Sequence, residues 1–246
     1  MNLVPIFAEN LYAIRYNEGE KDAFAQLFED WNDMVFLEDF FETNKKDLYG
    51  GYFGIINVET AVIRTKLFAE LLQKQFLELS ASCKRNEKPD LDGFFKPLNE
   101  NDSYMMKLLK CKGYESWLRI YAIKIESNTY VITGGGIKLT RTMNREHLLK
   151  ILTSNIPSKW EEEALWREEN KAWLERSAAI ALKVLRELRI QSLSQKDLAI
   201  RLNVSAQQVN KWLKGQENLS LSTISKMEEA LNIILVEIPN QAIYKV

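Results

Sequence analysis

The C-terminal part of the chain carries amide and ammonium side chains at the spacing of one helix face. Val209 and Leu213 lie four residues apart and predict the buried side of a helix. Gln207, Gln208 and Lys211 are left on the outside of that helix. Glutamine can pair with adenine in the major groove through two hydrogen bonds, and lysine can reach guanine or a phosphate. The chemistry expected here is the reading of base edges.

A second set of polar side chains lies near the middle of the chain. Apolar residues recur at every second position in Ser116–Lys124 and in Tyr130–Thr140, which predicts the two strands of a hairpin. The alternation places Arg119 and Lys138 on the face away from the core, with Tyr121 beside Arg119. Arginine can clamp a phosphate, and a lysine or tyrosine on the same face can move protons.

The residues around the C-terminal set have the pattern of two helices joined by a tight turn. Ser194 is expected to cap a first helix, and Ser205 is expected to cap a second. Asn203 stands where the turn between them needs a residue that tolerates left-handed backbone geometry. Gly215 is expected to end the second helix.

The residues that would position the central set are spread over the N-terminal half. Gly134–Gly136 lies inside a predicted strand and indicates a bulge or a close approach of backbone. Ser158 and Glu161 predict a capping box at the start of another helix. The other expected elements are an opening strand over 3–16, short helices around 24–31 and 37–41, a long helix near 59–84, a helix over 144–152 and a terminal strand over 234–238.

Composition excludes several classes of protein. The 246 residues are 46% hydrophobic and 27% charged, which indicates a folded chain of one or two domains. No apolar run approaches the ~20 residues of a membrane-spanning helix, and no signal peptide is recognisable, so a cytoplasmic protein is expected. A single histidine excludes a multi-histidine metal site. Neither a metal ion nor a cofactor is expected.

Charge is balanced overall but not locally. Residues 1–50 hold 4 basic and 11 acidic residues, whereas 107–150 and 171–214 each hold 9 basic and 3 acidic residues. Two separate basic blocks suggest two separate contacts with phosphate-rich partners, although solvated helix faces would give the same counts.

Residues 191–215 resemble the Xre-type, phage repressor-like helix-turn-helix family, and Leu219–Ile224 continues the pattern. The likeness covers roughly residues 175–233. It implies that the second helix of the motif enters the major groove of operator DNA and that Gln195 contacts the DNA backbone. The DNA-binding residues that it implies are Gln195, Ser205, Gln207, Gln208 and Lys211.

The predicted hairpin is similar to the inner strands of RelE/HigB-type toxins, on the residues Leu118–Ile120 and Ile137–Arg141. The paired lysines usual in HigB-like strands appear here as Lys138 followed by Leu139. The resemblance implies an α+β N-terminal domain with a small antiparallel sheet and helices, and a metal-independent endoribonuclease acting on mRNA at the ribosome. The implied catalytic residues are Arg119, Tyr121, Lys138 and Arg141, and the implied RNA-binding residues are Lys112 and Lys124.

An acidic segment rich in tryptophan joins the two halves. Trp160, Trp166 and Trp173 fall within fourteen residues around Glu161–Glu169. Tryptophan is enriched at the centres of protein contacts, so these residues are candidates for a toxin-neutralising contact with the basic hairpin of 107–150. Packing inside the C-terminal domain is the other interpretation.

Together these features predict three parts: a toxin domain over 1–155, a connecting helix over 156–174 and an all-α, Xre-type antitoxin domain over 175–246. The function predicted first is a fused type II toxin–antitoxin protein of the HigB–HigA kind, whose C-terminal half neutralises the toxin and represses its own operator. The alternatives are a one-component transcriptional regulator with a non-catalytic N-terminal module, and a gyrase-directed toxin of the ParE branch. A two-fold operator would require a homodimer, expected through the helix-turn-helix half.

Overall fold

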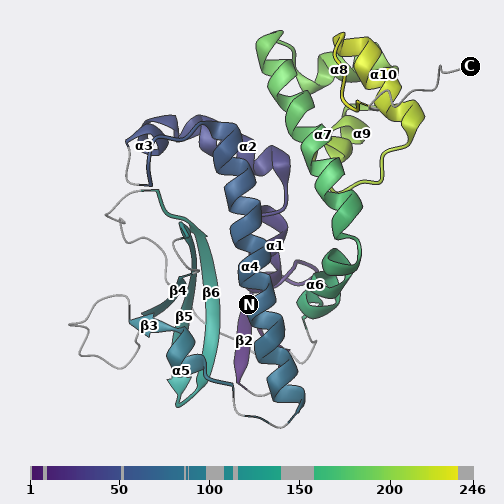
Figure 1. Cartoon of the computed structure of the whole chain (residues 1–246). Helices are drawn as coiled ribbons and strands as arrows, with labels where there is room; N and C mark the ends of the chain where they lie inside the picture. Colours follow the sequence, from purple (N-terminus) through teal and green to yellow (C-terminus); the bar gives the residue numbers. More distant parts are fainter. Residues whose placement is uncertain are drawn as a thin grey trace, which may run out of the picture. The chain divides into compact units, whose positions relative to one another are not determined.

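The computed structural model of the chain describes residues 2–7, 10–50, 53–85, 87, 89–97, 108–112, 116–139 and 158–237, of which 97 and 108–112 are described by their backbone alone. The chain forms two compact units (Figure 1). The first comprises Met1–Asn32 and Asp39–Glu169, and the second comprises Asp33–Glu38 and Asn170–Val246. No helix in the described residues is both long and apolar enough to cross a membrane.

The first unit is built around a six-stranded mixed sheet in the order β1-β2-β6-β5-β4-β3. All neighbouring strands are antiparallel except β2 and β6, which are parallel. The expectation of an antiparallel sheet is therefore wrong at this pair. The cause is the expected opening strand, which is instead a hairpin whose second strand lies beside β6. The strands are β1 (Asn2–Phe7), β2 (Leu11–Arg15), β3 (Lys96–Pro97), β4 (Leu108–Lys112), β5 (Leu118–Glu126) and β6 (Thr129–Ile137).

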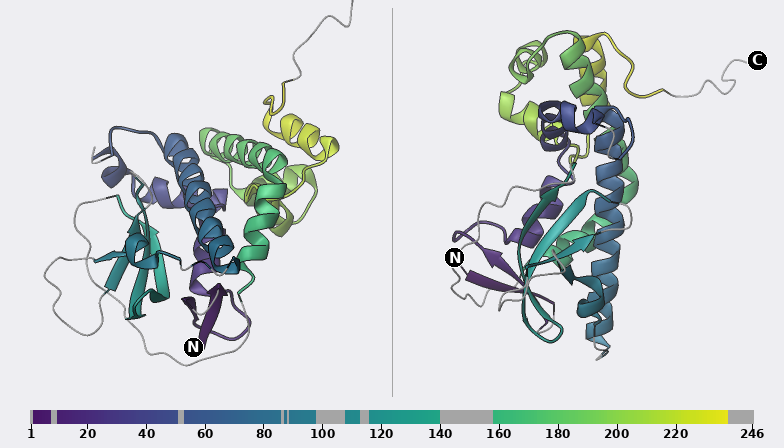
Figure 2. Two further views of the ribbon diagram at one scale, coloured as in Figure 1. Left: turned by 60° about the horizontal axis from the view of Figure 1, so that its bottom comes forward. Right: turned by 90° about the vertical axis from the view of Figure 1, so that its left-hand side faces the viewer.

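The helices α1 and α4 lie on one side of this sheet (Figure 1, Figure 2). The two short helices and the long helix expected from apolar periodicity are present as α1, α2 and α4. Asp22 caps α1 by accepting hydrogen bonds from the backbone N–H groups of Phe24 and Ala25, and Asn57 caps α4. The helices up to the end of the first unit are α1 (Ala23–Asp30), α2 (Met34–Thr43), α3 (Lys45–Tyr49), α4 (Val58–Lys84), α5 (Leu91–Phe94) and α6 (Trp160–Glu169).

Two tryptophans organise the core of the first unit. Trp117 is 1% exposed, and its indole N–H donates to the Thr65 hydroxyl at 2.9 Å. Trp160, the first residue of α6, is fully buried. Aromatic rings surround both indoles: Phe41, Phe53 and Phe68 pack on Trp117, and Phe24, Phe28 and Phe76 pack on Trp160.

The glycine run in β6 forms both features expected of it. Gly134 has a positive φ of 151° where the pairing of β5 with β6 shifts register after Tyr121. Gly135 lies so close to β5 that an added Cβ would come within 2.3 Å of the Arg119 carbonyl oxygen and 2.8 Å of Leu27 Cδ1. An added Cβ at Gly136 would meet nothing within 4 Å.

Substitution of Gly135 by alanine is expected to lower the free energy of unfolding by about 1–3 kcal/mol, because the new methyl group overlaps backbone. Gly136→Ala is the matched control one residue along β6. It should be neutral or stabilising by up to about 1 kcal/mol, since it restricts only the unfolded chain. Urea unfolding of both full-length variants measures the difference. Equal destabilisation of the two would contradict the close approach at Gly135.

The turn between β5 and β6 holds α5 through a network of side chains. Asn128 has a left-handed backbone with φ 60°, and its side-chain oxygen accepts from the Leu91 N–H at 2.8 Å. Asp92 accepts from Lys124 Nζ at 2.7 Å, from the Tyr130 hydroxyl at 2.5 Å and from the Asn128 N–H at 3.1 Å. The hydrogen bonds from Lys124 and then Tyr130 lower the pKa of Asp92 from 3.8 to about 2.

This shift predicts how acid affects the fold. A carboxyl group whose pKa is depressed by folding stabilises the folded state above its ordinary pKa of 3.8, and that contribution is lost as the pH falls toward about 2. Asp92→Asn should therefore be less stable than wild type at neutral pH and should lose less stability between pH 4 and pH 2. Thermal melts across this range test the prediction, with the exposed Glu18→Gln as control. Parallel pH profiles for wild type and Asp92→Asn would refute it.

The second unit is helical in its C-terminal part, with α7 (Lys171–Ile190), α8 (Gln195–Leu202), α9 (Ala206–Leu213) and α10 (Leu221–Leu231). The strand expected over 234–238 is absent from its described residues 234–237. There the N–H groups of Leu235 and Val236 donate to Glu228 Oε1 instead of to a neighbouring strand. The helix expected over 144–152 lies outside the described residues.

The capping box expected at Ser158 forms only in part. The Ser158 hydroxyl accepts from the Trp160 N–H at 3.2 Å, but the Ser158 N–H donates to the Pro5 carbonyl. Glu161 accepts from Ser80 and Lys84 on α4, so its carboxylate is used in tertiary contacts.

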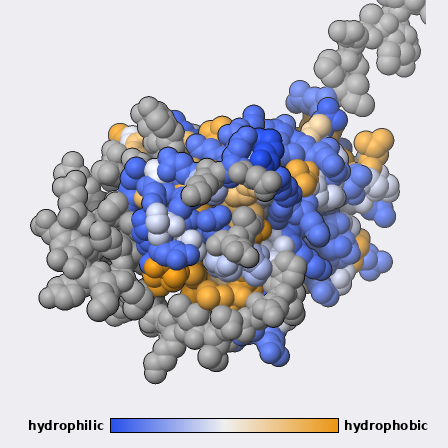
Figure 3. All heavy atoms as spheres, turned by 90° about the horizontal axis from the view of Figure 1, so that it is seen from below, coloured by the Kyte–Doolittle hydropathy of each residue, from blue (hydrophilic) through white to orange (hydrophobic). Residues whose placement is uncertain are grey.

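Hydrophilic side chains predominate among the coloured residues of the face in Figure 3, and hydrophobic ones gather in separate patches.

Candidate nucleic-acid interface

The turn between α8 and α9 is defined by its end residues. Ser194 caps α8 in a full capping box with Asp197, whose pKa is lowered by the hydrogen bonds from Ser194. Asn203 ends α8 in the left-handed conformation, with φ 54° and ψ 47°. Ser205 caps α9 by accepting from the Gln208 N–H at 3.1 Å. The three expectations for these residues are confirmed, and the caps fix where α9 begins.

Buried residues hold the two helices against their neighbours. Leu198 and Ala199 of α8 are buried, as are Val209 and Leu213 of α9. A hydrogen bond from Asn210 Nδ2 to Gln195 Oε1, at 3.2 Å, links the polar sides of the two helices. The orientation of α9 relative to α8 is thus set by both apolar packing and a polar contact.

The outer side of α9 is open to solvent at its N-terminal end. Ser205, Gln207 and Lys211 are exposed, and Gln208 is half-buried. Gln195, at the start of α8, is half-buried beside them. The five residues expected to bind DNA therefore lie in one helix pair, and three of them carry exposed side chains. A helix whose N-terminal residues are exposed in this way fits the major groove of B-DNA.

Lys211 on α9 and Lys214 at its C-terminal end both form ion pairs with carboxylates. Lys211 Nζ lies 3.1 Å from Glu217 Oε1, in the connection between α9 and α10. Lys214 Nζ lies 3.0 Å from Asp33 Oδ2, and the Lys214 carbonyl accepts from the Met34 N–H. Asp33 belongs to the second unit by its packing. Binding of a phosphate at either lysine would compete with these carboxylates.

Comparison with known proteins identifies this region. The model of a helix-turn-helix family, HTH_3, matches residues 185–238. The matched residues include a helix-turn-helix, formed by α8, the turn at Asn203 and α9. The match runs from the end of α7 past α10, so it contains the whole of α8, the turn and α9. No curated protein and no solved structure matches the chain significantly.

The helix-turn-helix supports a DNA-binding role of the kind that transcription regulators have. Sequence reasoning found its caps, its turn and its exposed side chains, but it missed Asn210 and Glu217. Asn210 links α9 to Gln195, and Glu217 pairs with Lys211. The position of Asn210, between the outward Gln207 and Lys211, could have indicated such a role. Nothing local in the sequence pairs Glu217 with Lys211.

The residues expected to catalyse RNA cleavage do not all lie together in one site. Arg119, expected on the open face of the hairpin, is only 7% exposed. Its guanidinium donates to the carbonyl oxygens of Ser116 and Leu118, at 2.6 and 2.7 Å. The expectation of an outward Arg119 is wrong because both faces of β5 are buried at this end: Trp117 on the same face is also buried, and so is Leu118 on the other.

Tyr121 and Lys138 do come together. Both line a cavity of about 240 Å³ whose wall also includes Phe40, Asp47 and Gly136. Tyr121 is half-buried, and this burial raises the pKa of its hydroxyl, while the charge of Arg119 opposes the rise. The other expected residues lie elsewhere: Lys124 pairs with Asp92, the side chain of Lys112 lies outside the described residues, and so does Arg141.

The three tryptophans of the acidic segment do not share one environment. Trp160 is buried in the first unit, Trp166 on α6 is 45% exposed, and Trp173 lies half-buried on α7 with its indole N–H donating to Asn170. The acidic side chains of α6 also pair within the first unit. Glu161 contacts Lys84 at 2.6 Å and Glu163 contacts Lys21 at 2.7 Å, both lysines lying outside the 107–150 hairpin.

Proposed function

We propose that the chain is an operator-binding transcriptional regulator whose α9 reads base pairs in the major groove. The observation that carries the proposal is the exposed N-terminal end of α9, held in register by the Ser205 cap and by the Asn210–Gln195 hydrogen bond. Gln207 and Gln208 would contact adenine edges, and Lys211 would contact guanine or a phosphate. Ser205 and Gln195 would position the helix on the DNA backbone. The first unit would be a partner- or ligand-binding module.

Selection of duplex DNA from a random-sequence pool by the full chain tests this function. A defined sequence should be enriched, and the triple variant Gln207→Ala/Gln208→Ala/Lys211→Ala should enrich none. Lys226→Ala, on the exposed side of α10, is the control and should select the same sequence as wild type. Absence of enrichment by a folded wild-type chain would refute operator binding.

A fused toxin–antitoxin protein is the second candidate, favoured by the cavity that Tyr121 and Lys138 share. In this function the first unit would cleave ribosome-bound mRNA by attack of the RNA 2′-hydroxyl on the adjacent phosphate, which breaks the bond from phosphorus to the 5′-oxygen of the next nucleotide. The 2′-hydroxyl would lose its proton to water, Lys138 would stabilise the charge of the phosphate, and Tyr121 would donate a proton to the departing 5′-oxygen. The second unit would neutralise this activity and repress its own operator.

The toxin function is tested by inducing residues 1–169 in bacteria beside the full chain. The fragment extends to Glu169 because Trp160 belongs to the core of the first unit. Arrest of translation by the fragment alone, relieved by Lys138→Ala, would support the toxin. Normal growth with a folded fragment would leave the regulator as the function of the chain.

A further inference from the structure

The long helix α4 carries a continuous exposed seam on one side. Six residues at alternating spacings of three and four are all exposed: Arg64, Leu67, Leu71, Lys74, Glu78 and Ala81. This spacing is the a/d pattern by which helices pair with other helices. Leu67 is 50% exposed and Leu71 is 61% exposed, and Ile63 beside them is 51% exposed. Ile63, Leu67 and Leu71 form an exposed aliphatic patch in the N-terminal half of α4, and such a patch is a candidate interaction surface.

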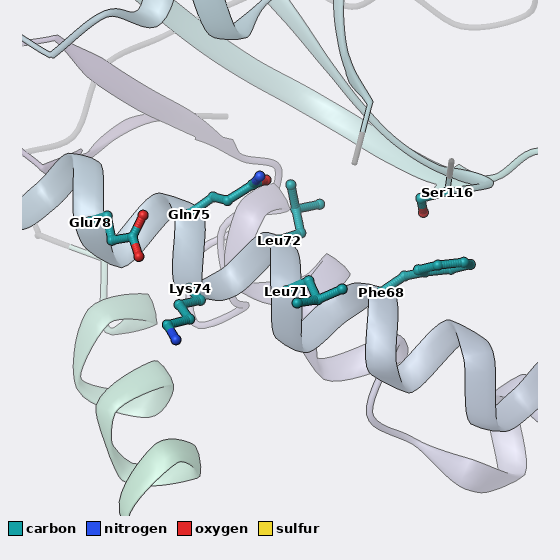
Figure 4. Close-up of a pocket in the computed structure, with 7 residues that line it drawn as sticks. All are labelled: Phe68, Leu71, Leu72, Lys74, Gln75, Glu78 and Ser116. Atoms are coloured by element: carbon teal, nitrogen blue, oxygen red, sulfur yellow. The ribbon is translucent and has the colours of Figure 1, made fainter. Parts of the chain in front are cut away.

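A cavity borders this seam. It has a volume of about 270 Å³ and is lined from α4 by Phe68, Leu71, Leu72, Lys74, Gln75 and Glu78, with Ser116 on the far side. Figure 4 shows Phe68 and Leu71 side by side on the helix and Ser116 across from them. Leu71, Lys74 and Glu78 belong to both the cavity wall and the seam, so an aliphatic side chain that packed on the seam would find a recess there.

The charges along the seam select what can pack on it. Arg64 is the first residue of the seam. Leu71 lies midway between Arg64 and Glu78, seven residues from each. Suppose that a second α4 runs antiparallel to the first, with Leu71 facing Leu71. Each Arg64 then lies opposite Glu78 of the other copy, which gives two pairs of opposite charge. A parallel pair would instead oppose like charges at both ends. The described residues contain no ion-pair partner for Arg64 or Glu78 within one chain.

We infer that α4 is a homodimer interface, formed by antiparallel pairing with α4 of a second copy about a two-fold axis at Leu71. In this register Leu67 of the second copy lies opposite Gln75, at the edge of the cavity. The methylene stem of Lys74 covers apolar surface beside the axis while its ammonium group reaches water. The inference comes from α4 alone and is independent of DNA binding, although a two-fold operator requires such a dimer.

The size of the interface predicts its strength. A helix of 27 residues is about 40 Å long. With a contact width of roughly 10 Å it covers roughly 400 Å² on each copy, about half of a standard stable interface. An interface of this size falls among weak, reversible associations, so the dimer should dissociate on dilution.

Sedimentation of the full chain over a range of concentrations tests the dimer. Leu71→Arg should raise the dissociation constant at least about 100-fold, because two buried arginines would meet at the axis. The control is Ile125→Arg on β5, where the native side chain is 59% exposed, almost as much as Leu71. It should leave the dissociation constant unchanged. A wild-type monomer at all concentrations, or a dimer indifferent to Leu71→Arg, would overturn the inference.

Charge reversal tests the antiparallel register separately from folding. Arg64→Glu and Glu78→Lys should each weaken self-association by about tenfold, since each replaces two attractive pairs by two repulsive ones. Mixing the two variants should restore association, because each pair across the interface then joins opposite charges again. The double variant Arg64→Glu/Glu78→Lys should also dimerise as wild type does. A mixture that associates no better than its components would overturn the register. Failure of operator selection with an intact dimer would count against the proposed function alone.

Discussion

Trp160→Ala is expected to lower the free energy of unfolding of the first unit by about 3–5 kcal/mol. The indole of Trp160 is fully buried, with its ring 4.7 Å from the ring of Phe24 and 5.7 Å from that of Phe28. Removal of the indole would leave a cavity that the packed rings of α1 and α4 around it cannot fill. Urea unfolding of the full chain, followed by far-ultraviolet circular dichroism, measures the loss.

Two further variants test whether the loss of stability comes from the burial of Trp160 or from a change in the α6 helix itself. Trp166→Ala lies on the same helix, six residues along, at a side chain that is 45% exposed, and should cost less than about 1 kcal/mol. Trp160→Phe should cost less than Trp160→Ala, because it keeps a ring and removes an indole N–H that has no hydrogen-bond partner in the described residues. Equal losses for Trp160→Ala and Trp166→Ala would show that α6 is not part of the core.

This placement of Trp160 changes the interpretation of the acidic segment. Its tryptophans and glutamates were predicted to contact either the basic hairpin or the C-terminal domain. The structure gives Trp160 and Glu161 partners on α1 and α4 of the first unit. Tryptophan and glutamate spacing could predict a helix with a buried residue. It could not predict the surface that buries it, because that surface is assembled from Phe24, Phe28 and Phe76, far away in the sequence.

Features decided by local chemistry were predicted well. Ser194 and Ser205 cap helices because their hydroxyls accept from N–H groups three residues ahead, and Asn203 turns the chain because asparagine tolerates a positive φ. Gly135 approaches β5 closely because no other residue lacks a Cβ. Each of these depends on a few neighbouring residues, which a single sequence displays directly.

Features decided by distant packing were not predicted. Alternation along β5 showed correctly that Arg119 and Ile120 point to opposite faces, but it could not show that both faces are covered at this end. The parallel pairing of β2 with β6 brings together residues 11–13 and 130–132, and nothing in either segment specifies the other. For the same reason Glu217 was not recognised as the partner of Lys211. The exposed positions on α9 were therefore predicted, while the ion pair of Lys211 with Glu217 was not.

The proposed reading of base pairs by α9 leads to the other large expected effect. Gln207→Ala should relax specificity at a single base pair, reducing the preference for adenine by about 1–3 kcal/mol while leaving other positions unchanged. The side chain of Gln207 is exposed, so its removal leaves the fold intact. We would measure the affinity of the variant for the selected operator and for operators with each of the three other base pairs at every position. These affinities give the base preference at each position. A uniform loss across all sequences would contradict base reading by Gln207.

Lys211 should behave differently from Gln207 if it reaches a phosphate. Lys211→Ala should weaken binding to all sequences alike and should reduce the salt dependence of the affinity by about one unit of slope. Glu217→Gln should do the reverse, because the carboxylate 3.1 Å from Lys211 competes with the DNA for the ammonium group. Titrations at several salt concentrations distinguish these variants from Lys226→Ala, whose slope should match wild type. A selective loss at one base pair in Lys211→Ala would instead assign Lys211 to guanine, so the slope and the base profile together decide how α9 contacts DNA.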